Sequence, residues 1–341
     1  VDYIYQCLYK KLRESPDTSF EDWVINRFGK KLYVTFFKDY THKLWGIPSD
    51  KLSSDWAAER ISLLDLWDVV LRLCGLGREA PRTYTKKFFY PKQGIGQIFE
   101  FIAREIKKYS GSIILNARLK KLLLEGNRAK GVIYELNGKD EVIHCDWVIS
   151  TIPVTDLLYK PERGGEYHNV STAVRSLRYR SLRFLNILID QSDVGRNTWT
   201  YIPDGKYIMT RIQEPKKRSP YNAPYGKTSL MLEIPCSYND EVWNMQDHLL
   251  FNRCIDDLSK LGIDIKDKVI DYFFTVEKHA YPIYHLDYKH HLNNLLSRVD
   301  SIENIHTCGR NGLFRYIFMD RAMEMGFEAA MIIEGKWNKK V

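Results

Sequence analysis

The segment that follows a predicted strand near the C-terminus carries the residues best suited to bind a charged group. The apolar run Ile305 to Cys308 predicts a strand, and Gly309 and Arg310 directly after it are typical of a tight turn. Further on, Asp320 is a typical residue at a helix start, and it precedes the helical pattern of residues 321–336. Such a turn and a helix N-terminus direct backbone N–H groups and a partial positive charge toward one place. We therefore predict a seat for an anionic group or an electron-rich ring at this point.

A second group of residues could bind an anion through guanidinium groups. Four arginines recur within one short stretch, with a tyrosine among them: Arg175, Arg178, Tyr179, Arg180 and Arg183. On a strand, Arg178 and Arg180 would share one face, because successive side chains point to opposite faces. A guanidinium can hold a diphosphate or a carboxylate with two parallel hydrogen bonds. The alternative is a solvated strand edge that the charges keep soluble, and both interpretations stay open.

Aromatic residues form a third candidate group. Tyr281, Tyr284 and His285 flank Pro282, either in a turn that approaches a pocket or in a purely structural turn. Aromatic residues make up 13% of the chain, with 22 Tyr and 8 Trp. This content suits a protein that lines a pocket for a flat or sugar-like ligand.

The sequence contains no pattern typical of a metal site, of nucleic-acid binding or of a membrane-spanning helix. The six cysteines show no CxxC spacing and the nine histidines show no zinc spacing, so we predict no metal site and expect free thiols in a reducing cytoplasm. The net charge of +8 favours anionic ligands such as nucleotide sugars, and allows a weak attraction to a membrane surface. The basic residues are scattered, so nucleic-acid binding is not predicted. No apolar run reaches the roughly 18 residues of a membrane-spanning helix.

The elements that would position these groups alternate between helices and strands. Residues 1–80 have mainly helical patterns, with a helix predicted from Phe20 to Phe28 after a Ser19 cap, another at 31–43 and another at 63–76. An amphipathic helix is predicted at 97–109, with Ile98, Phe101, Ile102 and Ile106 on its buried side. Short strands are predicted at 112–116, 119–125, 130–136, 141–144 and 147–153. A second sheet is predicted from strands at 182–190, 199–202, 208–212, 229–234 and 269–278, with a helix at 247–261.

Several of these segments, taken in order, resemble one flavoenzyme superfamily. Gly94 and Gly96 after Tyr90-Pro91, then Gly131-Val132, the segment Asp146 to Pro153 and finally Gly309-Arg310 resemble the amine oxidase, protoporphyrinogen oxidase and UDP-galactopyranose mutase superfamily. Upstream, residues 20–29, 40–48 and 55–61 resemble a bacterial and archaeal branch of protoporphyrinogen-oxidase-like proteins. The resemblance covers nearly the whole chain.

The resemblance implies roles for individual residues. In the family, the backbone at the position of Leu119 contacts the adenine side of FAD, and the turn of Thr151 and Pro153 lies along the ADP part. The Gly309-Arg310 pair contacts the pyrophosphate and ribityl region. The backbone at the helix start meets the pyrimidine edge of the flavin. The implied FAD-binding residues are Leu119, Thr151, Pro153, Gly309, Arg310, Met319, Asp320 and Arg321. The candidate substrate-binding residues are Arg178, Arg180, Tyr281, Tyr284 and Tyr316, and no catalytic residue is predicted.

The resemblance also implies an α/β (α+β) fold. We expect a partial FAD-binding domain of the glutathione-reductase type, with an interleaved mixed-sheet substrate domain and a helical lobe. The expected segments are a helical lobe at 1–87, an FAD-domain part at 88–154, a substrate-binding sheet at 155–285 and a second FAD-domain part at 286–341.

One part of the family's cofactor site has no counterpart in this sequence. In the family, an N-terminal strand, a glycine-rich loop and a helix hold the FAD pyrophosphate. Gly94-x-Gly96 does not replace that loop, because the third glycine is missing. Either the sequence begins after that segment or the protein has lost it; we expect the first, and we expect this chain alone to bind FAD poorly or not at all.

Three functions follow as expectations. The first is an FAD-dependent oxidoreductase that removes a hydride from a small or glycan-linked substrate. The second is a flavin-dependent mutase of nucleotide sugars, although Phe314 and Phe318 stand where the mutase motif has a tyrosine and an aspartate. The third is a ligand-binding protein without catalysis. An exposed sheet edge could also pair two copies of the chain.

Overall fold

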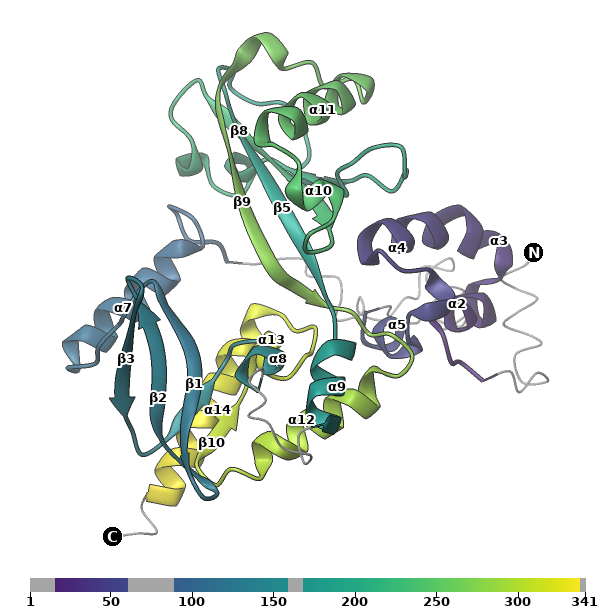
Figure 1. Cartoon of the computed structure of the whole chain (residues 1–341). Helices are drawn as coiled ribbons and strands as arrows, with labels where there is room; N and C mark the ends of the chain where they lie inside the picture. Colours follow the sequence, from purple (N-terminus) through teal and green to yellow (C-terminus); the bar gives the residue numbers. More distant parts are fainter. Residues whose placement is uncertain (1–15, 61–88, 159–167, 338–341) are drawn as a thin grey trace, which may run out of the picture. The chain divides into compact units, whose positions relative to one another are not determined.

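The computed structural model describes residues 16–60, 89–158 and 168–337, which belong to two compact units (Figure 1). The first unit comprises Val1–Glu105, Arg180–Lys278 and Tyr284–Leu286. The second comprises Ile106–Tyr179, His279–Ile283 and Asp287–Val341. The chain therefore passes between the units several times. The predicted helix at 63–76 lies outside the described residues.

The first unit begins with a group of short helices. Ser19 starts α2 with a capping box, in which its hydroxyl accepts from the Asp22 N–H while the Asp22 carboxylate accepts from the Ser19 backbone. The predicted helix at 31–43 is instead divided by a π-helical stretch, and α4 ends at Gly46 in the left-handed region. The helices are α2 (Phe20–Phe28), α3 (Lys30–Leu32), the π-helix η2 (Tyr33–Phe37), α4 (Lys38–Trp45), the 3₁₀ turn η3 (Ser49–Lys51) and α5 (Ser54–Arg60).

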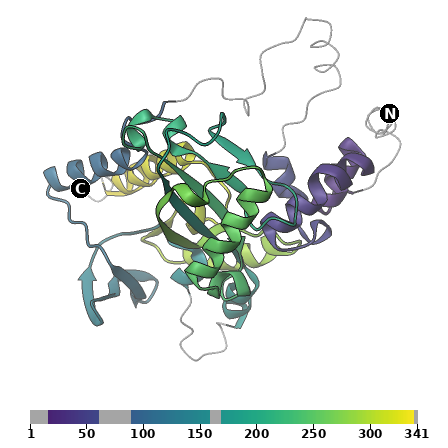
Figure 2. The same cartoon turned by 90° about the horizontal axis from the view of Figure 1, so that it is seen from above.

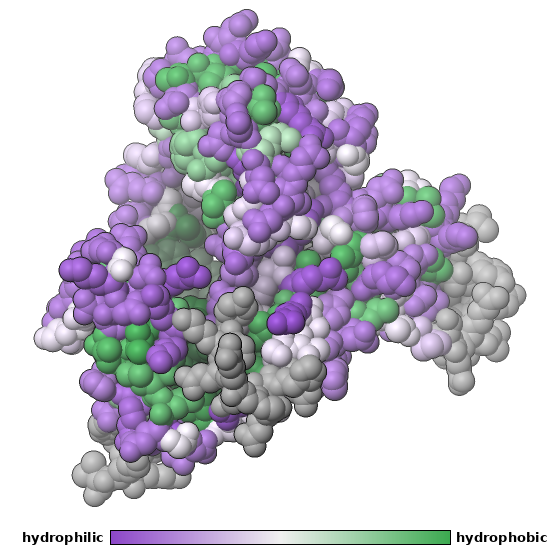
Figure 3. Space-filling view, viewed as in Figure 1, coloured by the Kyte–Doolittle hydropathy of each residue, from purple (hydrophilic) through white to green (hydrophobic). Residues whose placement is uncertain are grey.

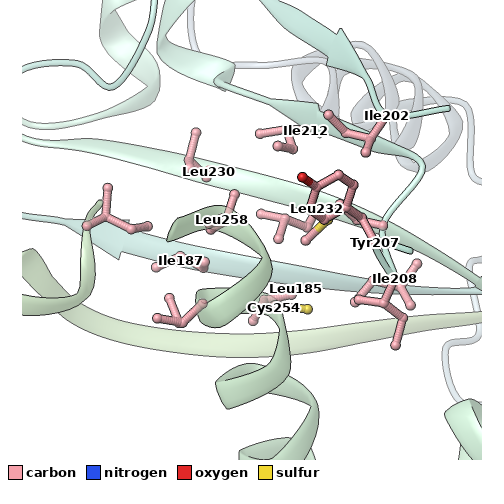
Figure 4. Packing of buried hydrophobic residues seen from close by; sticks show 14 of the residues in the cluster. Leu185, Ile187, Ile202, Tyr207, Ile208, Ile212, Leu230, Leu232, Cys254 and Leu258 are labelled. Atoms are coloured by element: carbon pink, nitrogen blue, oxygen red, sulfur yellow. The ribbon is translucent and has the colours of Figure 1, made fainter. Parts of the chain in front are cut away.

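Most of a five-stranded sheet also belongs to the first unit, in the order β6-β7-β8-β5-β9. Its strands are β5 (Tyr179–Ile189), β6 (Trp199–Tyr201), β7 (Arg211–Gln213), β8 (Thr228–Cys236) and β9 (Val269–Pro282). The helix α11 (Asp247–Lys260) packs its Cys254 and Leu258 against Leu185, Ile187 and Leu232 of the sheet (Figure 4). Shorter helical pieces are α10 (Glu241–Asn244), η5 (Pro215–Lys217), η6 (Pro220–Asn222) and η7 (Lys266–Lys268). Because side chains alternate along each strand, the apolar core lies on one face of this sheet.

The helix α7 (Gly96–Lys108) follows a tight turn at Gly94, as predicted, but its apolar side is not buried. Phe101 is 56% exposed, and Ile102 and Ile106 are exposed as well, so the prediction of a buried face is wrong for the described structure. Apolar side chains also reach the surface in the view of Figure 3.

A three-stranded antiparallel meander belongs to the second unit, and it forms a sheet of its own (Figure 2). It consists of β1 (Ala117–Glu125), β2 (Arg128–Leu136) and β3 (Lys139–His144). The two turns are at Gly126-Asn127 and Asn137-Gly138, as predicted, and both glycines have positive φ. The strand predicted at 112–116 is absent: these residues pair with no described strand, the backbone at Asn116 is left-handed, and β1 begins at Ala117.

The second unit also contains a pair of parallel strands, β4 (Val148–Ser150) and β10 (Ile305–Thr307). Its helices are α8 (Val154–Leu157), α9 (His168–Ser176), α12 (Tyr288–Asp300), α13 (Gly309–Gly312) and α14 (Met319–Trp337). Asn304 joins the meander to the parallel pair: its amide accepts from Ala129 N and donates to Ala129 O and Asp146 O, at 2.6–2.7 Å. This side chain is completely buried.

The observed units differ from the predicted segments at residues 88–105, 155–179 and 279–283, and at Leu286. Residues 155–179 belong to the second unit, because α9 packs against α12. Residues 88–105 belong to the first unit, where Ser219 Oγ donates to the Lys92 carbonyl at 2.5 Å. None of the described helices has the length and apolar character that crossing a membrane requires.

Candidate functional site

The carboxyl ends of β4 and β10 lie side by side in the second unit. Ser150 pairs with Thr307 in register, and the Cys308 N–H donates to the Ser150 carbonyl at 3.0 Å. Thr151 and Pro153 therefore follow one strand where Gly309 follows the other. In open α/β sheets, ligands bind outside the carboxyl ends of parallel strands. The structure thus brings together three residues that the sequence resemblance assigned to the FAD site.

Two glycines allow the backbone of α13 to approach the end of β4. Gly309 has φ +79°, and a Cβ there would lie 3.9 Å from the Thr151 side chain. At Gly312, a Cβ would lie 2.7 Å from Thr307 Oγ1 and 3.1 Å from the Ser150 carbonyl oxygen. The second position has no room for a side chain, so the close approach depends on Gly312. Sequence reasoning missed this residue, although the Gly-x-x-Gly spacing from 309 to 312 could have indicated it.

Arg310 is held in place by neutral groups. Its Nε and Nη2 donate to the Ile317 carbonyl at 3.2 and 2.5 Å, and Nη1 donates to the Ala280 carbonyl at 3.3 Å. Its guanidinium carbon lies 4.6 Å from the ring centre of Tyr316 and 5.7 Å from that of Tyr281. The two rings stack at 5.4 Å. The predicted residues Arg310, Tyr281 and Tyr316 therefore form one cluster.

The charge of Arg310 has no acidic counterpart in the part of the chain that the structure describes. Arg310 makes no salt bridge with any carboxylate of the described residues. The hydrogen bonds use one N–H of each nitrogen, so Nη1 and Nη2 each keep a second N–H. The side chain is half-buried, so part of it can be reached by a ligand. The cluster is therefore suited to bind an anion.

The fit of a polar cofactor is supported by buried polar atoms near the strand ends. Ser150 is 5% exposed, and its Oγ has no hydrogen-bond partner among the described residues. Asn311 Oδ1 in α13 is also a buried atom without a hydrogen-bond partner among the described residues. Buried polar groups in proteins are nearly always hydrogen-bonded, so these atoms fit a site that a polar ligand completes. Sequence reasoning did not identify either residue.

The start of α14 offers backbone rather than side-chain groups. The Ala322 N–H donates to the Phe318 carbonyl, so the N–H groups of Met319, Asp320 and Arg321 precede the first hydrogen bond of the helix. The Arg321 side chain is bound to Glu324 and Glu328 at 2.6 and 2.9 Å, along its own helix. The predicted role of this segment as a backbone contact to a flavin remains a prediction.

Leu119 lies in β1 opposite Tyr134, at a point where the register shifts before Lys121. The irregularity interrupts the regular pairing of the meander there. The predicted contact of its backbone with adenine is not tested by the geometry and stays a prediction.

Arg180 was predicted to contact substrate, but its side chain is buried against other parts of the protein. Its guanidinium donates to the Leu44 carbonyl at 2.9 Å, to the Lys43 carbonyl at 3.2 Å and to Ser237 Oγ at 2.8 Å. The side chain is 7% exposed and closes the C-terminal end of α4. Burial lowers the pKa of Arg180. These contacts give Arg180 a capping role in place of the predicted substrate contact.

The other members of the arginine group also depart from the expected strand face. Arg178 is exposed and precedes β5, which begins at Tyr179. Arg183 is buried and donates to the Val242 and Met245 carbonyls at 2.8 and 2.6 Å, where it closes the end of α10. A clamp made of neighbouring arginines is therefore not what the structure shows. Only Arg178 remains a candidate for substrate contact.

Tyr284 is also buried, at 1% exposure, and its carbonyl accepts from the Ser53 N–H at 2.6 Å. The predicted substrate contact of its side chain is not supported. Tyr179, by contrast, was not predicted as a site residue but supports α13, since its hydroxyl donates to the Asn311 carbonyl at 3.2 Å. Burial raises the pKa of Tyr179, which therefore stays neutral.

Comparisons with known proteins identify the family of this chain. The model of the family described as flavin-containing amine oxidoreductase matches residues 8–333. A crystal structure of reduced UDP-galactopyranose mutase is similar with a TM-score of 0.73 and 21% identity, over 92% of this chain and 67% of that one. A candidate protoporphyrinogen oxidase from Exiguobacterium sp. 255-15 gives a TM-score of 0.62 and 15% identity, over 91% of this chain and 66% of that one. A putrescine oxidase bound to putrescine gives 0.57 and 15%, over 94% of this chain and 68% of that one.

These likenesses confirm the predicted α/β fold class and the predicted superfamily. The chain spans about two thirds of the length of the three structures. Because the family model covers almost every residue, the assignment does not depend on a single motif. This chain belongs to the flavin-containing amine oxidoreductase family.

Proposed function

We propose that the chain binds FAD beside the carboxyl ends of β4 and β10, as part of an FAD-dependent oxidoreductase. The observation that supports this most directly is Arg310, a fixed and half-buried cation whose described partners are all neutral. A phosphate or another anionic group of a ligand would compensate this charge with charge-assisted hydrogen bonds. The substrate in this proposal is a small or glycan-linked molecule, and the compartment is the reducing cytoplasm.

The residues of this chain would bind and orient the reactants. A bound flavin would supply the redox chemistry by accepting a hydride from a C–N or C–C bond. Arg310 would hold an anionic group, while Tyr281 and Tyr316 keep its guanidinium in place. Gly312 lets the α13 backbone lie close to the end of β4, and Ser150 Oγ offers a buried hydroxyl to the same region.

A mutase of nucleotide sugars is the second candidate. It is favoured by the mutase structure, which has the highest TM-score of the three reported, and by the presence of both Arg310 and Tyr316. Two residues argue against it. Phe314 is buried against Tyr179 and has no hydroxyl to bind a sugar phosphate, and Phe318 is exposed without a carboxylate. A binding protein that lacks catalysis is the third candidate.

The cofactor proposal is tested by titrating FAD into the purified chain and following the fluorescence of the flavin. We expect Arg310→Met to weaken FAD binding by about tenfold or more, which corresponds to the loss of one strong contact. Arg315→Met is the matched control, because this neighbouring arginine is exposed and its replacement removes the same charge as the Arg310 variant does. Equal effects of the two changes would contradict a specific role for Arg310.

The three functions differ in what bound flavin does. An oxidoreductase would lose its visible flavin absorption when its substrate is added without oxygen. A mutase would bind UDP-sugars more tightly when the flavin is reduced, with no net change of its redox state. A binding protein would take up ligand without any flavin present.

A further inference from the structure

The face of the five-stranded sheet opposite α11 carries a connected group of polar and aromatic side chains. Ile212 and Leu232 point into the core with α11, so their neighbours in the same strands point to the other face. On that face, Tyr201, Arg211 and Glu233 lie in one row across β6, β7 and β8. Trp199 and Gln213 lie in the next row.

Two buried groups fix the positions of two arginines. Glu233 and Gln213 are both more than nine-tenths buried. Glu233 Oε1 accepts from Arg211 Nη2 and from Gln213 Nε2, and Gln213 Oε1 accepts from Arg218 Nη2 at 2.5 Å. The network contains two cations and one carboxylate. Arg211 is paired with this carboxylate, whereas the contacts of Arg218 are with the neutral groups of Gln213 and Trp199.

Two aromatic rings stand at the outer end of this network. Trp199 is 41% exposed and Tyr201 is 52% exposed, both on the edge strand β6. The Arg218 guanidinium lies 5.6 Å from the Trp199 ring centre, and the Arg211 guanidinium lies 5.7 Å from that of Tyr201. The Tyr40 ring from α4 meets Tyr201 edge-on at 6.4 Å. The rings are thus held in place before any ligand arrives.

We propose that this surface, formed by Trp199, Tyr201, Arg211 and Arg218, binds a sugar that carries a carboxylate or a phosphate. The apolar face of a sugar ring can pack on an exposed aromatic ring, while its hydroxyls both donate and accept hydrogen bonds. Guanidinium groups bind carboxylates and phosphates in a bidentate manner. The positive charge of Arg218 selects an acidic sugar over a neutral one. This proposal does not require FAD and goes beyond the proposed redox activity.

The test uses the full chain and three probes: glucuronate, glucose 6-phosphate and glucose. Saturation-transfer NMR reports their binding without FAD in the sample. We expect both acidic sugars to bind more tightly than glucose. Trp199→Ala should weaken their binding by about tenfold, the loss that corresponds to one good contact. Tyr225→Ala is the matched control, because this fully exposed tyrosine lies outside the group.

A second variant separates the charge from the rings. Arg218→Gln should remove the preference for acidic sugars over glucose while circular dichroism shows an unchanged fold. Tyr201→Ala serves as a further ring variant should Trp199→Ala fold poorly. Binding that is unaffected by both ring variants would overturn the proposal. Equal competition by inorganic phosphate alone would overturn the sugar part of it, because it would show an anion site without ring recognition.

This proposal and the proposed FAD site can fail independently. Arg310→Met should leave the binding of glucuronate unchanged, since Arg310 contacts none of the four residues that form the proposed surface. Loss of FAD binding with retained sugar binding supports both assignments. Retained FAD binding with no sugar binding overturns only the sugar surface.

Discussion

Replacing Gly46 tests the structural role of Arg180. Gly46 has φ +69°, and a Cβ there would lie 2.7 Å from Arg180 Nη1. Gly46→Ala therefore adds the strain of a left-handed residue, about 1–2 kcal/mol, and the overlap with a fixed guanidinium, about 1–3 kcal/mol. We expect the free energy of unfolding to fall by about 2–5 kcal/mol in total.

A matched glycine separates the two contributions. Gly262 follows α11 with φ +79°, and a Cβ there would have no heavy atom within 4 Å. Gly262→Ala should therefore cost only the backbone strain of about 1–2 kcal/mol. Urea unfolding followed by tryptophan fluorescence is a suitable assay, because Trp45 and Trp56 lie 5.2 Å apart beside the end of α4.

A double-mutant cycle then identifies Arg180 as the neighbour that gives rise to the overlap. Arg180→Met alone should cost about 2–4 kcal/mol, because it removes three hydrogen bonds from a charged donor while also removing the cost of burying that charge. In the double variant the overlap is gone, so the combined loss should be about 1–3 kcal/mol smaller than the sum of the single losses. Additivity within about 0.5 kcal/mol would refute the reasoning.

Three further predictions concern other parts of the chain. Asn304→Ala should lower the free energy of unfolding by about 3 kcal/mol, since it removes three buried hydrogen bonds, whereas Asn294→Ala should have little effect in the same urea titration. Gly312→Ala should weaken FAD binding by about tenfold because its Cβ would meet Thr307 and the Ser150 carbonyl, and a similar loss in Gly326→Ala, where the space is open, would contradict this. Burial lowers the pKa of Lys43 from 10.5 to about 8, so between these values the unfolded chain binds more protons. The thermal stability of the wild type relative to Lys43→Met should then rise as the pH increases from 8 toward 10.5, and a flat or falling difference would show that the pKa is not lowered.

The features that could be predicted from the sequence depend on short stretches of chain. The Ser19 capping box, the two meander turns and the start of α14 each follow from residues within a few positions of one another. The strand predicted at 112–116 failed because an apolar run does not show whether a neighbouring strand pairs with it, and no described strand does. The buried face predicted for α7 failed because periodicity shows which side is apolar but does not show what covers it.

The candidate site was also predicted from the sequence only where its residues are close together in the chain. Gly309 and Arg310 are adjacent and follow a strand, so a local motif indicates them. Ser150 was missed because its importance depends on a pairing with Thr307, which lies far along the chain. The carbonyls of Ala280 and Ile317 that fix Arg310 were missed as well. Any residue supplies a carbonyl, so no residue type marks such a partner.

The two arginines Arg180 and Arg310 show where reasoning from residue type ends. Both donate to backbone carbonyls, and neither makes a salt bridge with a carboxylate of the described residues. They differ in access: Arg180 is nearly inaccessible and lies against Gly46, whereas Arg310 is half-buried beside two aromatic rings. A guanidinium can bind a ligand only where its remaining N–H groups can be reached. Arg180 therefore uses its guanidinium to close a helix in the first unit, whereas the guanidinium of Arg310 in the second unit is available for an anion.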